Sequence, residues 1–264
     1  MTERQRIVSA LVSCFDDLEA LIATLGEDNW ALQSLCPEWT VRGVVEHLIG
    51  IEAMMTDWIP ESLEAPVPFE RVGAFTEEAA AWSNEELAAK ATEVLATRRA
   101  ELAELTDEVF DAPSMTPVGP STYGSFLGIR VFDFWVHQRD MTIPLGVNDR
   151  WDQGGDKAEI ALDEVNRSLG YIMGKKVGLP DGQSAAINVD GGVARRMSVA
   201  VDGRAAVVDS VENPDVELNA DSTTFVMLAC GRIDPQEEID AGRISWSGDA
   251  ELGEKAARNL RFTM

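Results

Sequence analysis

The spacing of apolar residues changes once along the chain, and this change restricts what the chain can fold into. In the first part, apolar residues such as Leu11, Phe15 and Leu18 recur at steps of three and four. Such spacing is typical of amphipathic helices. From about residue 184, short β-branched runs alternate apolar and polar residues instead. The pattern predicts a helical bundle followed by a small α+β domain.

Amphipathic segments in the first part are predicted to form a four-helix bundle. Thr40 suits the N-cap of the second helix, and Ser83 with Glu86 forms a capping-box pattern at the start of the third. Prolines predict long connections before and after that third helix. The expected helices span about 7–25, 41–55, 83–105 and 121–143, and a fifth at about 155–174 either completes the bundle or leads out of it.

Turn signals separate the alternating runs of the second part. Asp-Gly, Gly-Gly and Asn-Pro pairs between these runs predict antiparallel strands connected by turns. The expected strands are 184–190, 194–203, 204–210, 215–221 and 243–248, and the expected helices are 222–230 and 250–260. The predicted domains are therefore residues 1–175, the helical bundle, and residues 176–264, the α+β domain.

Composition restricts the partners and the compartment. The chain carries 46 Asp and Glu against 22 Lys and Arg, a formal net charge of -24 that would repel nucleic acids and anionic membranes. Three cysteines, Cys14, Cys36 and Cys230, lie far apart without a CxxC pair, which favours free thiols in the cytoplasm. No secretory leader or stretch of about 18 apolar residues is recognisable. We expect a monomer or small homo-oligomer, with no nucleic-acid or membrane partner.

The two histidines of the chain are the most informative residues for function. His47 shares a predicted helix face with Val44 and Ile51, so its imidazole should face the bundle interior. His137 follows Asp133 by four residues, which places both side chains on one side of a helix. Two imidazoles and one carboxylate could hold a divalent metal ion, zinc above all, and leave one position open. Spacing alone favours the simpler interpretation, a hydrogen-bonded core histidine and an ordinary helical pair.

Several other residues have two possible roles. Cys36 could be a further ligand or a redox thiol, although a buried structural cysteine is the simpler role. Arg130 could pair with Asp133 or face a ligand, and Asp140 could accept a hydrogen bond from an imidazole or merely end the helix. Four arginines of the second domain could bind an anionic substrate or act only as surface charges: Arg195, Arg196, Arg232 and Arg243.

Two motifs resemble those of the mycothiol-dependent maleylpyruvate isomerase family: CPEWTVRGVVEHLIG at 36–50 and DFWVHQRD at 133–140. The second part, through DVELNADSTTFVMLACGR and AGRISWSGD, also resembles that family's second domain. The resemblance implies a DinB-like four-helix bundle followed by a sterol-carrier-like α+β domain. It also implies that His47, Asp133 and His137 bind the metal ion, although the family more often has Glu where this chain has Asp133.

The resemblance further implies an enzyme that uses mycothiol as a cofactor. A metal ion stabilises a thiolate over a thiol, so a bound low-molecular-weight thiol would be a nucleophile at neutral pH. The expected reaction is isomerisation of, or S-transfer to, a small electrophilic substrate. The residues themselves do not choose between these two reactions.

Two other functions stay open. The sterol-carrier-like domain could bind a small apolar molecule or a lipid, with a structural or vestigial metal site in the bundle. Alternatively, the ion could activate water in a hydrolase. The only obvious general base for hydrolysis is Glu46, whose side chain is expected to point outward because it is next to the inward-facing His47.

Overall fold

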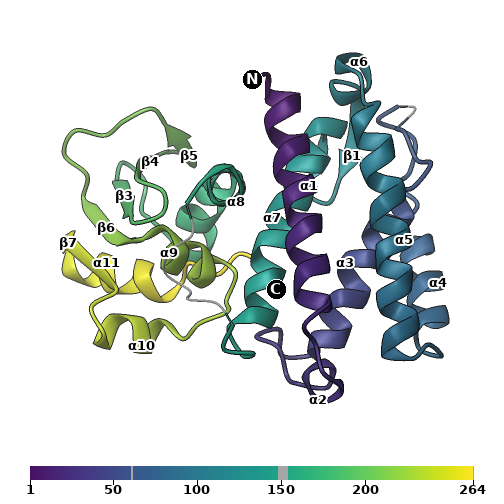
Figure 1. Ribbon diagram of the computed structural model, residues 1–264. Coiled ribbons are helices and arrows are strands. Elements are labelled where there is room, and N and C mark those ends of the chain that lie inside the picture. The colour runs from purple at the N-terminus through teal and green to yellow at the C-terminus, as the bar shows by residue number, and fades with distance from the viewer. Residues whose placement is uncertain (61, 148–153, 264) are drawn as a thin grey trace. The chain divides into compact units, whose positions relative to one another are not determined.

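The computed structural model describes residues 1–60, 62–147 and 154–263. Contacts divide the chain into two units, Met1–Asn148 and Asp149–Met264 (Figure 1). The predicted boundary after residue 175 is therefore corrected, because α8 (Asp156–Tyr171) packs on the sheet of the second unit. No helix in the described ranges is long and apolar enough to cross a membrane.

Four long helices form the first unit, as predicted. Helix α1 packs against α5 and α7, and α3 packs against the same two helices, so the four enclose one core (Figure 1). The bounds are α1 (Glu3–Ile22), α3 (Val41–Met55), α5 (Asn84–Ala103) and α7 (Tyr123–Thr142). Shorter elements connect them: α2 (Glu27–Trp30), α4 (Glu70–Ala79), α6 (Asp107–Phe110), and a hairpin of β1 (Pro113–Thr116) and β2 (Gly119–Thr122).

The helix starts follow from local hydrogen bonding. The Thr40 hydroxyl accepts the backbone N–H of Gly43 at the start of α3. Ser83 and Glu86 form the predicted reciprocal capping box, since each side chain accepts the backbone N–H of the other residue. These contacts satisfy N–H groups that have no partner inside the helix. The two predicted caps are confirmed.

The Pro-bearing connections contain structure that the sequence prediction missed. The stretch 59–82 includes α4, which begins just after the last proline of the stretch and packs on α3. Phe75 of α4 lies against Gly50 of α3, where a Cβ atom would be 3.2 Å from the ring. The loop after α5 contains α6 and the β1–β2 hairpin. Proline interrupts a helix but does not prevent one from starting a few residues later.

The second unit is built on a five-stranded sheet of order β5-β4-β3-β6-β7. Its strands are β3 (Ser184–Asp190), β4 (Arg195–Asp202), β5 (Arg204–Val208), β6 (Val216–Asp221) and β7 (Ile244–Gly248). All pairs are antiparallel except β3 and β6, which are parallel. The prediction of antiparallel strands throughout is therefore wrong for that pair. After β5, at one edge of the sheet, the chain crosses to the far side of β3 and forms β6 there. This crossover makes β6 parallel to β3, whereas a hairpin would make neighbouring strands antiparallel.

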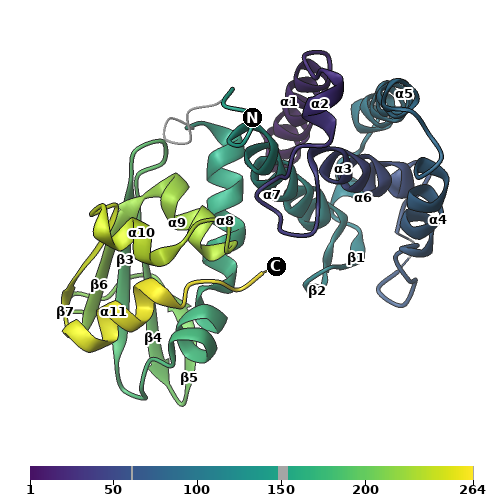
Figure 2. The ribbon, with the colours of Figure 1, turned by 90° about the horizontal axis from the view of Figure 1, so that it is seen from below.

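The helices of the second unit cover one face of the sheet (Figure 2). Met197, Ile187, Leu218 and Trp246 lie opposite one another across four neighbouring strands, so they share a face. On the other face, Asn188 and Arg196 bond to Glu217 and other polar groups. The helices are α8, the π-helical segment η1 (Ile172–Val177), α9 (Ser222–Ala229), α10 (Pro235–Asp240) and α11 (Ala250–Arg258). The predicted fold class, a helical bundle followed by an α+β domain, is confirmed.

Replacing two helical glycines by alanine should have opposite effects on stability. Gly253→Ala in α11 should lower the free energy of unfolding by about 1–3 kcal/mol, because a Cβ atom there would overlap the indole of Trp246 and lie 2.9 Å from the Cβ of that residue. Gly73→Ala in α4 should raise it by about 0.5–1 kcal/mol, because nothing lies within 4 Å of a Cβ atom at this exposed position. Urea unfolding measures the free energy of unfolding of both variants. Equal changes in the two variants would contradict the packing of α11 against Trp246.

Candidate metal centre

Neighbouring helices bring together the three residues that the sequence predicted as metal ligands. His47 comes from α3, and Asp133 and His137 come from α7. The Nε2 atom of His47 is 3.2 Å from Oδ2 of Asp133, and the Nε2 atom of His137 is 3.3 Å from Oδ1 of the same carboxylate. One potential ligand atom from each residue lies within 4.8 Å of the other two.

These distances suit a small tetrahedral ion. Ligand atoms at about 2.0–2.1 Å from zinc lie about 3.4 Å from one another, because the edge of a tetrahedron is about 1.6 times the distance from its centre to a corner. The two N···O separations, 3.2 Å to Oδ2 and 3.3 Å to Oδ1 of Asp133, are each close to the length of that edge, although they end on different oxygens. Two imidazoles and one carboxylate are also a donor set that zinc accepts. The residues therefore fit a divalent ion in chemistry, and their ligand atoms lie close enough together to reach one ion.

The group is enclosed on one side and open on another. The His137 side chain is 7% exposed, whereas those of His47 and Asp133 are 23% and 24% exposed. The Trp39 ring centroid is 4.7 Å from that of His47 and 5.6 Å from that of His137, so the indole packs on both imidazoles. A fourth ligand could thus approach from the side of the two partly exposed residues, as a catalytic metal site requires.

Asp140 fixes the orientation of one imidazole. Its Oδ2 atom is 2.8 Å from Nδ1 of His137. If Nδ1 donates its proton there, the lone pair of Nε2 faces Asp133, the arrangement usual for a metal-binding histidine. Asp140 is fully buried, so the contact is shielded from water. Of the two roles considered for Asp140, the geometry favours the hydrogen-bond acceptor.

Cys36 lies on the far side of His137 from Asp133. Its Sγ atom is 3.4 Å from Oδ2 of Asp140 and 4.0 Å from Nδ1 of His137. It therefore does not complete the group of His47, Asp133 and His137. Cys36, His137 and Asp140 form a second group whose ligand atoms also lie within 4.8 Å of one another. The two groups share His137, whose Nδ1 faces Cys36 and Asp140 and whose Nε2 faces Asp133.

Buried ion pairs connect Asp133 to charged residues in the core of the bundle. Arg130 donates through Nη1 to Oδ2 of Asp133, and its Nε atom is 2.8 Å from Oε1 of Glu52. The other oxygen of Glu52 accepts Nε of Arg98 at 3.0 Å. Glu52, Arg98 and Arg130 are at most 2% exposed. Arg130 therefore pairs with Asp133, one of the two roles considered for it, and is itself held in place by Glu52.

Glu52 and Arg98 were not among the residues predicted from the sequence. Glu52 continues the buried row of α3 formed by Val45, Leu48 and Met55, at steps of three and four. A lone acid on an apolar helix face is a signal for a buried partner, because an unpaired buried carboxylate is strongly unfavourable. The partner itself could not be read from the sequence, since Arg98 lies on another helix.

The environment shifts the pKa of each residue of the group. Burial lowers the pKa of His47 below its ordinary value, although the Asp133 carboxylate opposes this. Burial alone would raise the pKa of Asp133, but the charges of His47 and Arg130 hold it well below its ordinary value. Burial also disfavours protonated His137, yet the Asp133 carboxylate raises the pKa of this histidine well above its ordinary value. Binding of an ion would therefore displace a proton from His137.

The other candidate residues have partners elsewhere. The carboxylate of Glu46 is 2.7 Å from Nε of Arg42, so it is engaged in an ion pair within α3. Arg195 pairs with Asp163, Arg196 with Glu217 and Arg243 with Glu238, and Nη1 of Arg232 donates to the carbonyl of Cys230 at 2.8 Å. Each of these four arginines thus has a partner in the second unit.

Two family models match the chain. The model described as the mycothiol maleylpyruvate isomerase N-terminal domain matches residues 11–142, and the model of the MDMPI C-terminal domain matches residues 159–255. The chain belongs to the mycothiol-dependent maleylpyruvate isomerase family. The resemblance inferred from the motifs at 36–50 and 133–140 is thereby confirmed.

Solved structures agree on the fold of this family member. Two crystal structures of the mycothiol-dependent maleylpyruvate isomerase, one of them a mutant, match 95% of this chain and 95% of their own, with TM-scores of 0.62 and 0.60 and identities of 15% and 14%. A shorter match, to sterol carrier protein 2 from Yarrowia lipolytica, covers 39% of this chain and 91% of that one at 14% identity and a TM-score of 0.30.

One curated relative is the uncharacterized protein Rv0738 of Mycobacterium tuberculosis. It is 26% identical over 131 residues, which are 50% of this chain and 63% of that protein. The chain thus spans less than two thirds of the length of this relative. This relative is uncharacterized, so the match assigns no activity to the chain.

Breaking the buried ion pairs of Glu52 should destabilise this family member strongly. We expect Glu52→Gln to lower the free energy of unfolding by about 3–5 kcal/mol, because Arg98 and Arg130 would be left buried without a carboxylate between them. The matched control is Glu93→Gln, which breaks an exposed pair with Lys90 and should change that free energy by less than about 0.5 kcal/mol. Urea unfolding compares the two variants. Similar effects would show that the Glu52 pairs add little to stability.

Proposed function

We propose that the chain is a metal-dependent enzyme that activates a low-molecular-weight thiol, mycothiol by family, for reaction with a small electrophile. One observation carries this proposal: the Nε2 atoms of His47 and His137 converge on the carboxylate of Asp133 at 3.2 and 3.3 Å, in a member of a mycothiol-dependent family. The reaction would be isomerisation of the electrophile or S-transfer to it.

Each residue of the centre would have a distinct task. His47, Asp133 and His137 would supply the ligands, and Asp140 would hold the imidazole of His137 with Nε2 free to bind. Arg130 would restrict rotation of the Asp133 carboxylate and keep it ionised. When bound, a divalent ion such as zinc would favour the thiolate form of a thiol at its open position, and that thiolate would be the nucleophile.

Elemental analysis of untagged protein tests the metal site. We expect about one equivalent of zinc or another divalent metal in the unmodified chain and a loss of most of it in His47→Ala. Cys36→Ser is the matched control, because Cys36 contacts His137 and Asp140 but belongs only to the second group. Retention of metal in His47→Ala together with its loss in Cys36→Ser would place the ion in the second group. Absence of metal from both the unmodified chain and a metal-reconstituted sample would exclude the centre.

A turnover assay with mycothiol tests the reaction. The metal-loaded protein should convert maleylpyruvate or a related electrophile, and Asp133→Asn should reduce kcat/KM by at least about a hundredfold, because the uncharged amide is a poor metal ligand. Isomerisation regenerates the thiol, whereas S-transfer consumes one thiol for each product. Titrating free thiol during turnover therefore separates the two reactions. Failure to convert any of a panel of electrophiles, with the metal in place, would contradict the proposed enzyme.

A further inference from the structure

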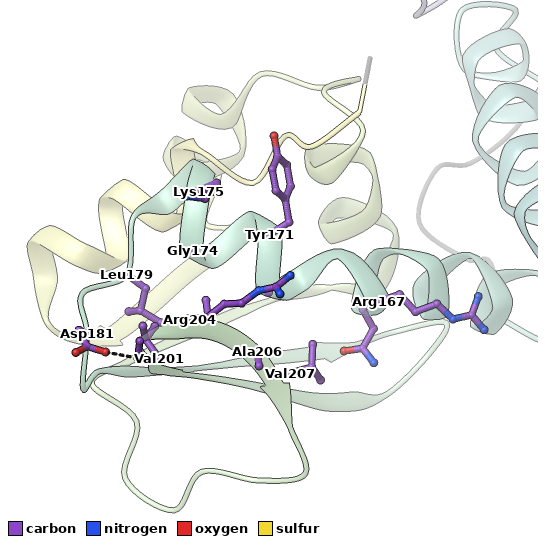
Figure 3. Close-up of a pocket in the computed structure, with 14 residues that line it drawn as sticks. Arg167, Tyr171, Gly174, Lys175, Leu179, Asp181, Val201, Arg204, Ala206 and Val207 are labelled. Carbon is purple, nitrogen blue, oxygen red and sulfur yellow. Dashed lines mark hydrogen bonds between the residues drawn. The ribbon is translucent and has the colours of Figure 1, made fainter. Parts of the chain in front are cut away.

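A cavity of about 890 Å³ lies within the second unit, apart from the metal centre in sequence and in chemistry. Its walls come from the end of α8, the π-helical segment η1, and strands β4 and β5 (Figure 3). Sites for small molecules commonly have volumes of about 300–1,000 Å³. The cavity is therefore large enough for a ligand of cofactor size.

Small residues line the two sides where helix and strand approach each other. A Cβ atom at Gly174 would lie 2.8 Å from that of Ala205, and one at Gly170 would lie 3.0 Å from the carbonyl oxygen of Ala205. Leu179, Val201 and Val207 add apolar surface to the lining. Val207 is 41% exposed, although it is a large apolar residue on an edge strand. The cavity thus offers an apolar wall that the protein leaves uncovered at Val207, whereas Leu179 is buried.

The charge of the lining is opposite to that of the chain. Acidic residues outnumber basic ones by 46 to 22 in the sequence, yet the cavity is lined by Arg167, Lys175 and Arg204 and by one acid, Asp181. The carboxylate of Asp181 accepts the backbone N–H of Gly203 at 2.7 Å. A concentration of positive charge in a strongly acidic protein is an electrostatic preference for an anion.

Two of these cations are free of carboxylate partners in the described part of the chain. Arg167 pairs with Glu164 and points away from the other cations in Figure 3. No ion pair joins Lys175 or Arg204 to any described carboxylate, and Arg204 extends toward the helix that carries Tyr171 (Figure 3). Lys175 lies in η1, and π-helical turns are rare and frequently mark functional sites.

We propose that this cavity binds an amphipathic organic anion, with its carboxylate or phosphate group at Lys175 and Arg204 and its apolar body along Val201, Leu179 and Val207. Charge selects the head group, and the uncovered apolar wall holds the body. All of its lining residues belong to the second unit, and none of them is a candidate metal ligand. Because of its cationic lining, the cavity is expected to bind negatively charged amphipathic molecules rather than any apolar molecule.

Calorimetric titration of the full chain with decanoate, decyl phosphate and decanol tests the proposal. The three probes share a ten-carbon tail, and only decanol lacks a charge. We expect at least one anion to bind about tenfold or more tighter than decanol, and the affinity to fall as salt is raised. The tighter of the two anions identifies the head group. Equal affinity for decanol, or no binding of either anion, would overturn the proposal.

Charge reversal locates the binding. Arg204→Glu and Lys175→Glu should each weaken binding of the tighter anion about tenfold or more, because both positions are exposed and tolerate the change without loss of core packing. Arg258→Glu makes the same change in net charge on α11, outside the lining, and should leave the affinity within about twofold. Equal weakening by all three variants would mean that only net charge matters and would overturn the assignment to this cavity.

Discussion

Charges buried inside the bundle need partners, and this requirement fixes how α3 packs against α7. Glu52 of α3 has no exposed surface, and it is stable there because Arg98 and Arg130 donate to its two oxygens. Arg130 in turn donates to Asp133 on its own helix. Sliding α3 by one turn along α7 would leave several of these groups buried without a partner. The register of the two helices and the geometry of the candidate metal centre therefore have the same physical cause.

This arrangement explains how a short side chain can occupy the middle of the centre. Asp133 has one methylene fewer than glutamate, so its carboxylate reaches less far from the helix. Arg130 on one side and two imidazoles on the other surround its oxygens, and their positive charge offsets the unfavourable burial of the carboxylate. Asp140 then restrains His137 from behind. Contacts within the protein thus arrange the three candidate side chains.

The second unit reflects a different constraint, the position of its edge strand. Because the chain crosses from β5 to the far side of β3, β5 remains at an edge of the sheet beside α8 and η1. Small residues let helix and strand approach there. Lys175 and Arg204, which form no ion pair with a carboxylate of the described residues, line the same cavity. The two units of this chain thus differ in chemistry, because the candidate metal-ligand donors lie in one unit and a cavity lined by cations lies in the other.

The sequence alone predicted the four bundle helices, the caps at Thr40 and Ser83 and the strand segments of the second unit, because periodicity and capping are local properties. It did not select His47, Asp133 and His137 by spacing, which favoured ordinary core residues, but by their place in two motifs that resemble those of a known family. It did not determine α4, which follows prolines, or the parallel pairing of β3 with β6, which depends on a crossover. The roles of Glu52 and the boundary after residue 148 were also decided only by the tertiary structure. The physical reason is that a buried charge or an amphipathic helix specifies that a partner must exist, whereas packing of distant segments decides which one it is.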